Sequence, residues 1–225
     1  IKSKGLALFS YVLGDKESGE CVVIDPRRDV DIFLDTTRQN DLRITNIIET
    51  HIHADFVSGS RELSYHTGVP VSVSASAEVN FDHQSLAEGD TVSIGEYQLE
   101  VIHTPGHTPE HISLLVSGGT GADQPWGLFT GDTLFAGEVG RPDLLGEGTE
   151  EKLARQLFHS LKEKVLRLDG EIVIYPAHGQ GSPCGANIGD RKTSTIGYEL
   201  KNNPTLSIDD EDRFVKTVMD ELSPA

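Results

Sequence analysis

Residues 50–56 read THIHADF, in which two histidines and an aspartate stand at alternate positions and a phenylalanine follows. Imidazole and carboxylate groups without a thiolate suit Zn, Fe, Mn or Ni, so the spacing alone does not choose the metal. The run ITNIIET (44–50) before them is apolar and β-branched, as in a strand. The sequence therefore predicts metal ligands at a strand end, and Phe56 stands where a further ligand would otherwise follow.

Six further apolar runs have the pattern of strands, with helical patterns between some of them. These runs are ECVVID (20–25), VPVSVSA (69–75), YQLEVIHT (97–104), HISLLVS (111–117), WGLFTGD (126–132) and EIVIYPAHG (171–179). The clearest helical pattern covers 150–168, and weaker ones cover 29–40, 58–68 and 207–225. SGGTGADQP (117–125) has the composition of an exposed turn. This mixture predicts an α/β protein with helices packed over one or more sheets.

Length, charge and cysteine content narrow the class of protein. A chain of 225 residues with a net charge of -17 predicts one domain, 1–225, and excludes nucleic acid as an expected partner, because phosphate binding needs a basic surface. No apolar run approaches the roughly 20 residues of a membrane span, so we expect a soluble protein without membrane contacts. Two widely separated cysteines and the lack of an export signal favour the cytoplasm.

Four ligand-type side chains follow four predicted strands. They are His51, His107, Asp132 and His178. A single histidine or aspartate in such a place is more often a surface residue, but glycine and proline punctuate these strand ends and allow turns that aim side chains into one cleft. Together with His53 and Asp55 they predict a metal site. No site role is assigned to the other histidines, which are His66, His83, His103, His111 and His159.

The motifs THIHAD, TPGHT, FTGDTLF and YPAHG, in this order and over essentially the whole chain, resemble the metallo-β-lactamase superfamily. The resemblance implies a four-layer αβ/βα sandwich, with two mixed β-sheets face to face, helices outside and the metal at one edge. Hydrolases similar to glyoxalase II have THxHxDH, in which the last histidine helps to hold a second metal ion. Phe56 replaces that histidine, so we expect one well-held metal rather than a tight pair.

The chain resembles the persulfide dioxygenase branch in having Phe56 at this position and in four motifs, HADFVSGSRELS, HTPEHISLL, LFAGEVGRPDL and YPAHGQGSPCG. More narrowly, it is similar to the bacterial form that is often fused to a rhodanese domain. Members oxidise the terminal sulfur of a low-molecular-weight persulfide, such as glutathione persulfide, with O2 to sulfite and release the thiol. The resemblance implies one Fe(II) per chain, with zinc as the alternative metal. Its ligands, which are also the catalytic residues, are expected to be His51, His107 and Asp132.

Further roles follow from the same resemblance. We expect three residues to orient the ligands or to hydrogen-bond metal-bound water, namely His53, Asp55 and His178. Arg141 matches the position at which the family binds a carboxylate of the thiol carrier, and an ion pair with Asp143 is the competing interpretation. Arg191 and Lys192 are weaker candidates for the same role. Cys184 is expected at the mouth of the site, either flanking substrate, forming a transient persulfide, or inert.

Two other functions stay open at this point. One is a metal-dependent hydrolase of a thioester or lactone, and the other is a noncatalytic module that keeps the fold; intact ligands argue against the second. The chain begins with Ile1 rather than Met, so we expect that preceding residues were removed. A rhodanese domain either was never part of the protein or follows the end of this chain. A separate rhodanese partner and a homo-oligomer are both compatible with the sequence.

Overall fold

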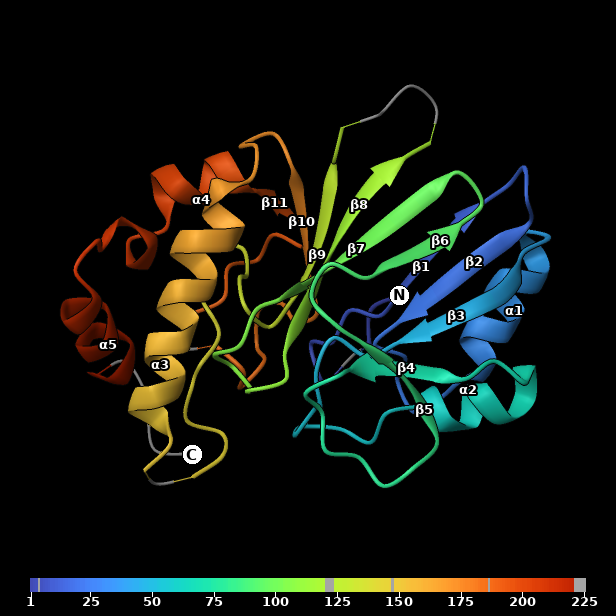
Figure 1. Cartoon of the computed structure of the whole chain (residues 1–225), viewed down its shortest axis with the longest axis horizontal. Helices are drawn as coiled ribbons and strands as arrows, with labels where there is room; N and C mark the ends of the chain where they lie inside the picture. The colour runs from blue at the N-terminus through green and yellow to red at the C-terminus, as the bar shows by residue number, and fades with distance from the viewer. Residues whose placement is uncertain (4, 120–123, 147, 186, 221–225) are drawn as a thin grey trace.

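The computed structural model describes residues 1–3, 5–119, 124–146, 148–185 and 187–220. Two β-sheets lie face to face, and helices cover the outer side of each sheet (Figure 1). This is the four-layer α/β sandwich that the motifs predicted. No helix in the described ranges combines the length and apolar character needed to cross a bilayer.

The first sheet contains the strand that leads into the THIHADF segment. Its order is β1 (Tyr11–Asp15), β2 (Glu20–Ile24), β3 (Arg43–Ile48), β4 (Val71–Ser74) and β5 (His83–Leu86). β1 is antiparallel to β2, and the other neighbours are parallel. The parallel connections run through α1 (Asp31–Gln39) and α2 (Ser60–Thr67), which lie on the outer face (Figure 1). Strands covered on both faces in this way read as continuous apolar runs.

The second sheet supplies the other strand ends. Its order is β11 (Ser194–Thr195), β10 (Val173–Pro176), β9 (Gly127–Gly131), β8 (Ile112–Gly118), β7 (Tyr97–His103) and β6 (Thr91–Ile94). β9 and β10 are parallel, and the remaining pairs are antiparallel. The outer face is covered by α3 (Glu150–His159), α4 (Ile196–Asn202) and α5 (Glu211–Asp220) (Figure 1).

Alternation along the strands divides the apolar residues between the layers. In β2, Val22 and Ile24 belong to the core between the two sheets, whereas Cys21 and Val23 belong to the core beneath α1 and α2. A third core lies between the second sheet and its helices and includes Leu157. Because side chains of a strand point alternately to its two faces, one short run such as CVVI contributes to two cores at once.

The helix predicted over 150–168 is regular only in α3. It continues as a π-helical turn, Ser160–Lys164, and a 3-10 turn, Val165–Arg167. The Ser160 hydroxyl donates to the carbonyl of Pro105 at 2.6 Å, so this irregular segment is fastened to the loop that carries His107. β1, β5, β6, β11 and α4 were not predicted, because each is a short segment of at most seven residues. The predicted turn 117–125 lies partly outside the described residues.

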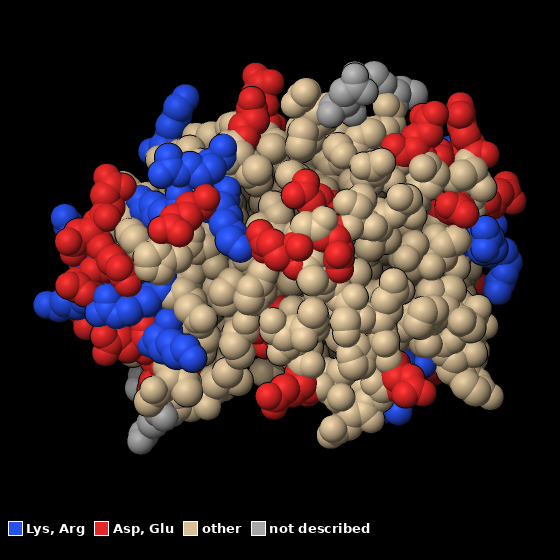
Figure 2. Space-filling view, viewed as in Figure 1, with Lys and Arg blue, Asp and Glu red and all other residues tan. Residues whose placement is uncertain are grey.

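Charged side chains on the helical layer are mixed in sign (Figure 2). Arg155 of α3, for example, pairs with three acidic groups, Glu151, Glu211 and Asp212, at 2.9 to 3.1 Å. The basic groups on this face are therefore neutralised locally, and exposed pairs of this kind contribute little to stability.

Leu157 packs α3 against the turn that precedes His107. It is fully buried, and a Cβ added to Gly106 would stand 2.5 Å from its Cα, so the helix lies directly against the turn before His107. We expect Leu157→Ala to lower the free energy of unfolding by about 2–5 kcal/mol in urea denaturation, because the cavity cannot close fully. The exposed control Lys152→Ala should change it by less than about 0.5 kcal/mol. Equal losses in both variants would contradict this packing.

Candidate metal centre

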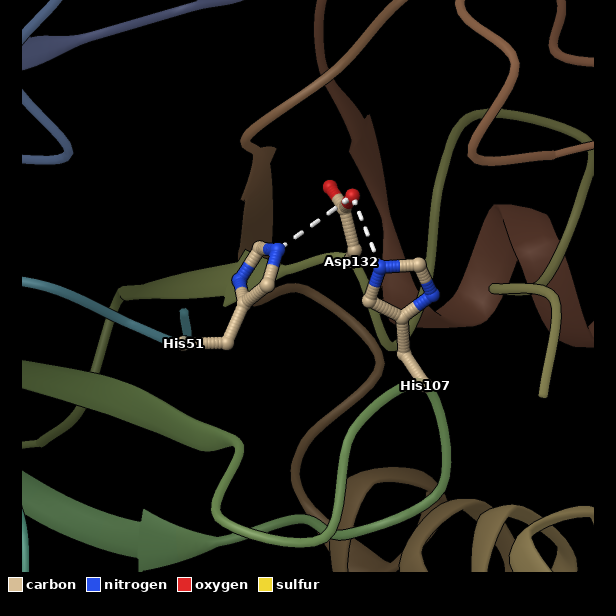
Figure 3. Close-up of side chains that lie close together, drawn as sticks. All are labelled: His51, His107 and Asp132. Atoms are coloured by element: carbon tan, nitrogen blue, oxygen red, sulfur yellow. Dashed lines mark ion pairs between the residues drawn. The ribbon is translucent and has the colours of Figure 1, made fainter. Parts of the chain in front are cut away.

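Three predicted ligands converge at the edge of the sandwich (Figure 3). His51 follows β3, His107 lies in the loop from β7 to β8, and Asp132 follows β9 directly. Asp132 Oδ2 lies 3.6 Å from His51 Nε2 and 3.4 Å from His107 Nε2. All three side chains are buried, and one ligand atom from each lies within 4.8 Å of the others.

Hydrogen bonds fix which nitrogen each imidazole offers. The Thr50 hydroxyl donates its proton to Asp25 Oδ2 at 2.9 Å, so it accepts the Nδ1 proton of His51, also at 2.9 Å. The carbonyl of Arg141 accepts the Nδ1 proton of His107 at 2.8 Å. Burial lowers the pKa of both histidines and keeps them neutral. Each ring therefore directs an unprotonated Nε2 at the carboxylate, the form that binds a metal.

His111 holds the backbone of the third ligand. Its Nε2 accepts the N–H of Asp132 at 2.9 Å, and its ring stacks on that of His51 with centroids 5.0 Å apart. Burial lowers the pKa of His111 to about 3, so the ring stays neutral and can accept this bond. Gly131 has a φ of +50°, and a Cβ there would stand 2.4 Å from His111 Nε2. The glycine in TGDT is thus required for this close approach, whereas the sequence pattern did not mark His111.

His178 lies between two carboxylates. Its Nδ1 is 2.8 Å from both carboxylate oxygens of Asp132, and its Nε2 is 3.1 Å from Asp55 Oδ2. Burial works to lower the pKa of His178, but these two carboxylates raise it and favour the charged form of the ring. Burial likewise works to raise the pKa of Asp132, but the contact with His178 holds it well below its usual range. Asp132 therefore stays ionised and is suited to bind a cation.

His53 lies beside His51, with ring centroids 4.0 Å apart, and contacts a different pair of carboxylates. Its Nε2 lies 3.2 Å from Asp25 Oδ1 and 3.6 Å from Glu49 Oε2, and the Phe56 ring lies against it with centroids 4.5 Å apart. Burial raises the pKa of Glu49 to about 7. Asp25 directly follows β2. Like the predicted ligands, it is a ligand-type residue at the end of an apolar strand, but it was not among the predicted site residues.

A second set of ligand atoms also lies close together. Atoms of His53, Asp55 and His178 are within 4.8 Å of one another, and those of Asp25, Glu49 and His53 form a further such set. In both sets the imidazoles lie 3.1 to 3.6 Å from carboxylate oxygens, although both ring nitrogens of His53, both oxygens of Asp55 and Nε2 of His178 have no hydrogen-bond partner in the described part of the chain. The set of His51, His107 and Asp132 differs in combining two neutral imidazoles, whose Nδ1 atoms are held by protein groups, with an ionised carboxylate, and this donor set fits Fe(II).

The predicted substrate-binding residues are engaged with protein groups. Arg141 donates to both oxygens of Asp143 at 2.6 Å and to the carbonyl of Pro183 at 3.1 Å, so the ion pair considered as the competing interpretation is formed. It is largely buried rather than at the surface. Arg191 lies over the Tyr198 ring, 3.9 Å from its centroid, and pairs with Glu199 at 3.3 Å. Carboxylate binding by either arginine stays a prediction.

Cys184 is buried beside the predicted metal centre, and whether it contacts substrate or is inert stays a prediction. The residue is 4 % exposed and packs with Phe135 and Ile188, and its thiol lies close to His178 and Asp132. Burial raises the pKa of the thiol to about 11. The thiol is therefore protonated at neutral pH and a weak nucleophile.

The comparisons with known proteins agree with this geometry. The model of the metallo-β-lactamase superfamily matches residues 5–178. The mitochondrial persulfide dioxygenase ETHE1 of Bos taurus is 34% identical over 96% of this chain and 77% of its own. A metallo-β-lactamase structure from Staphylococcus aureus has a TM-score of 0.93 at 38% identity, covering all of this chain and 67% of that one. The structure of ETHE1 from Myxococcus xanthus has a TM-score of 0.85 at 28% identity, covering 100% and 90%.

The chain therefore belongs to the metallo-β-lactamase superfamily and, within it, groups with the persulfide dioxygenases. Hydrolases are also among its relatives. A hydroxyacylglutathione hydrolase of Hahella chejuensis is 37% identical, but over 72% of this chain and 58% of its own. A probable zinc-dependent hydrolase of Bacillus velezensis is 28% identical over 92% of this chain and 85% of its own, so the dioxygenase relatives differ from it in identity rather than in coverage.

Thr50→Val tests the hydroxyl that orients His51. The substitution keeps the shape but removes the bridge to Asp25, so we expect metal affinity to fall about 10- to 100-fold, as for other lost partners of metal-ligating histidines. The measurement is competition with a chelator of known affinity. Thr45→Val is the matched control, since the Thr45 hydroxyl donates to the carbonyl of Cys21 on β2, accepts from the side-chain amide of Asn46 and bonds no residue of the metal centre. An unchanged affinity in Thr50→Val would contradict the assigned role.

The two cysteines should be unreactive in the folded protein. Both are buried, and burial raises the pKa of each thiol to about 11. We expect a disulfide reagent at pH 8 to label less than about a tenth of either thiol within minutes, because the thiolate is the reacting form. In denaturant, both should react fully. Rapid labelling of Cys184 in the native protein would show that it is accessible after all.

Proposed function

We propose that the protein is a persulfide dioxygenase with one Fe(II), held by His51, His107 and Asp132, that acts on glutathione persulfide or a related small persulfide in the cytoplasm. The observation that carries the proposal is the convergence of two neutral imidazoles and one ionised carboxylate, with the Nε2 atoms of His51 and His107 directed at Asp132 Oδ2. The names of the relatives support the reaction type. Three ligands leave further coordination positions open for reactants, as in other iron oxygenases with this donor set.

The overall reaction is balanced with one water. A persulfide, R–S–SH, reacts with O2 and H2O to give the thiol R–SH, sulfite and two protons. The S–S bond breaks, the terminal sulfur is oxidised by four electrons, and O2 is reduced by the same four. Bound Fe(II) supplies the redox chemistry that O2 requires, which no side chain provides.

The surrounding residues keep the ligands in their working protonation states. His178 balances the negative charge of Asp132, and Asp55 balances the second N–H of His178. Thr50 and the Arg141 carbonyl hold the Nδ1 protons of the two histidines. Because these partners exist before substrate arrives, the site needs no rearrangement to bind a metal.

A metal-dependent thioester hydrolase is the second candidate. The observation in its favour is the neighbouring set His53, Asp55 and His178, which with Asp132 could hold a second ion. Phe56 argues against it, because the ring lies against His53 where hydrolases similar to glyoxalase II have another ligand. Zinc content with thioesterase activity would favour this candidate over the dioxygenase.

Oxygen uptake tests the proposal. Anaerobically purified protein with iron should consume O2 on addition of glutathione persulfide and form sulfite in equal amount. His107→Ala should lose at least about a thousandfold of this activity, because removing one of three ligands disrupts the centre. His159→Ala, a half-exposed histidine on α3, is the control and should retain it. Full activity of the zinc-loaded protein would contradict the proposal.

A further inference from the structure

A pocket of about 220 Å³ opens beside the metal centre. Its wall includes His51 and His53 from the centre, together with Phe56, Arg61, Val79 and Phe81. Because His51 contributes to both, a molecule in this pocket lies next to the predicted metal ligands. Pockets for whole drug-sized ligands measure about 300–1,000 Å³, so this one has room for part of a small substrate.

The wall of the pocket combines apolar surface from Phe56, Val79 and Phe81 with buried polar groups of His53 and Glu49. Phe56 packs on His53, so the residue that removes a metal ligand also forms the pocket wall. Glu49 lines the same pocket and is 4 % exposed. Its Oε2 has no hydrogen bond within the described part of the chain and lies 3.6 Å from His53 Nε2. A wall with apolar surface and a few buried polar atoms without hydrogen bonds suits an organic chain that carries polar groups.

Arg61 contributes a positively charged side chain to the pocket wall. Its guanidinium lies 5.4 Å from the centroid of the Phe81 ring, and no ion pair or hydrogen bond of this group occurs among the described residues. Arg141, the arginine that the sequence favoured for anion binding, already bonds both oxygens of Asp143 and a backbone carbonyl. In a chain of net charge -17, an unpaired guanidinium beside the site is therefore the better anion partner.

We propose that this pocket binds the organic carrier of the persulfide, a small thiol compound whose anionic group pairs with Arg61. This inference rests on the proposed function and names the part of the site that selects its substrate. The apolar wall takes the chain between the sulfur and the anionic group, so that the sulfur end lies toward His51. The carrier class is a low-molecular-weight thiol with a carboxylate or phosphate several bonds from the sulfur.

Kinetics with two persulfides test the pairing. For Arg61→Gln we expect the KM for glutathione persulfide to rise about tenfold, with kcat within twofold, because a charge-assisted contact made with the carrier is lost. The KM for n-propyl persulfide, which has no anionic group, should stay within twofold. Arg61→Lys should recover part of the loss. Arg28→Gln is the control, since Arg28 is exposed in the same part of the fold and is paired with Glu62.

Calorimetry of glutathione, the thiol product, separates this inference from the proposed function. The purified metal-containing wild-type protein should bind glutathione about tenfold more tightly than Arg61→Gln. Equal affinities and equal KM values would overturn the pocket assignment, as would the same KM increase for both persulfides. If the wild type binds glutathione through Arg61 but turns over no persulfide, the proposed function fails and the pocket assignment stands.

Discussion

A fully buried carboxylate, Asp132, has to remain charged, and much of the site follows from that constraint. Desolvation of a carboxylate in a protein interior favours its neutral form unless opposite charge or hydrogen-bond donors compensate. Here His178 contacts both oxygens, His51 and His107 face one of them, and His111 accepts the backbone N–H. His178 thus stabilises the anion, His111 fixes the backbone that carries it, and His51 and His107 complete the donor set for a cation.

The fold meets this requirement by bringing strand ends of both sheets to one edge. The N–H of Ala177 bonds the carbonyl of Gly131 at 2.8 Å, which aligns the parallel strands β9 and β10 where Asp132 and His178 follow them. The N–H of Ile112 bonds the carbonyl of Thr50 at 2.8 Å and connects the second sheet to the loop after β3. Backbone hydrogen bonds between the sheets therefore set the distances between side chains that lie far apart in sequence.

Much of this could be read from the sequence, because strands buried on both faces leave apolar runs and their ends are marked by glycine and proline. The ligand types after those runs identified His51, His107 and Asp132 as neighbours. What the sequence did not indicate depends on three-dimensional packing. The bond from His111 to Asp132, the burial of Cys184 and the π-helical turn after α3 all arise from contacts between distant segments. The ion pair between Arg141 and Asp143 was predicted only as an alternative to binding of a substrate carboxylate by Arg141. The sequence alone does not show whether two nearby residues of opposite charge pair with each other or with other groups.

Because Phe56 stands where related hydrolases have a metal-ligating histidine, we expect the site to bind only one metal ion tightly. Anaerobic titration of metal-free protein with Fe(II), in wild type and in Phe56→His, tests it most directly. The account predicts saturation at one equivalent in the wild type and uptake of a second ion in the variant. Two tightly bound equivalents in the wild type would contradict it.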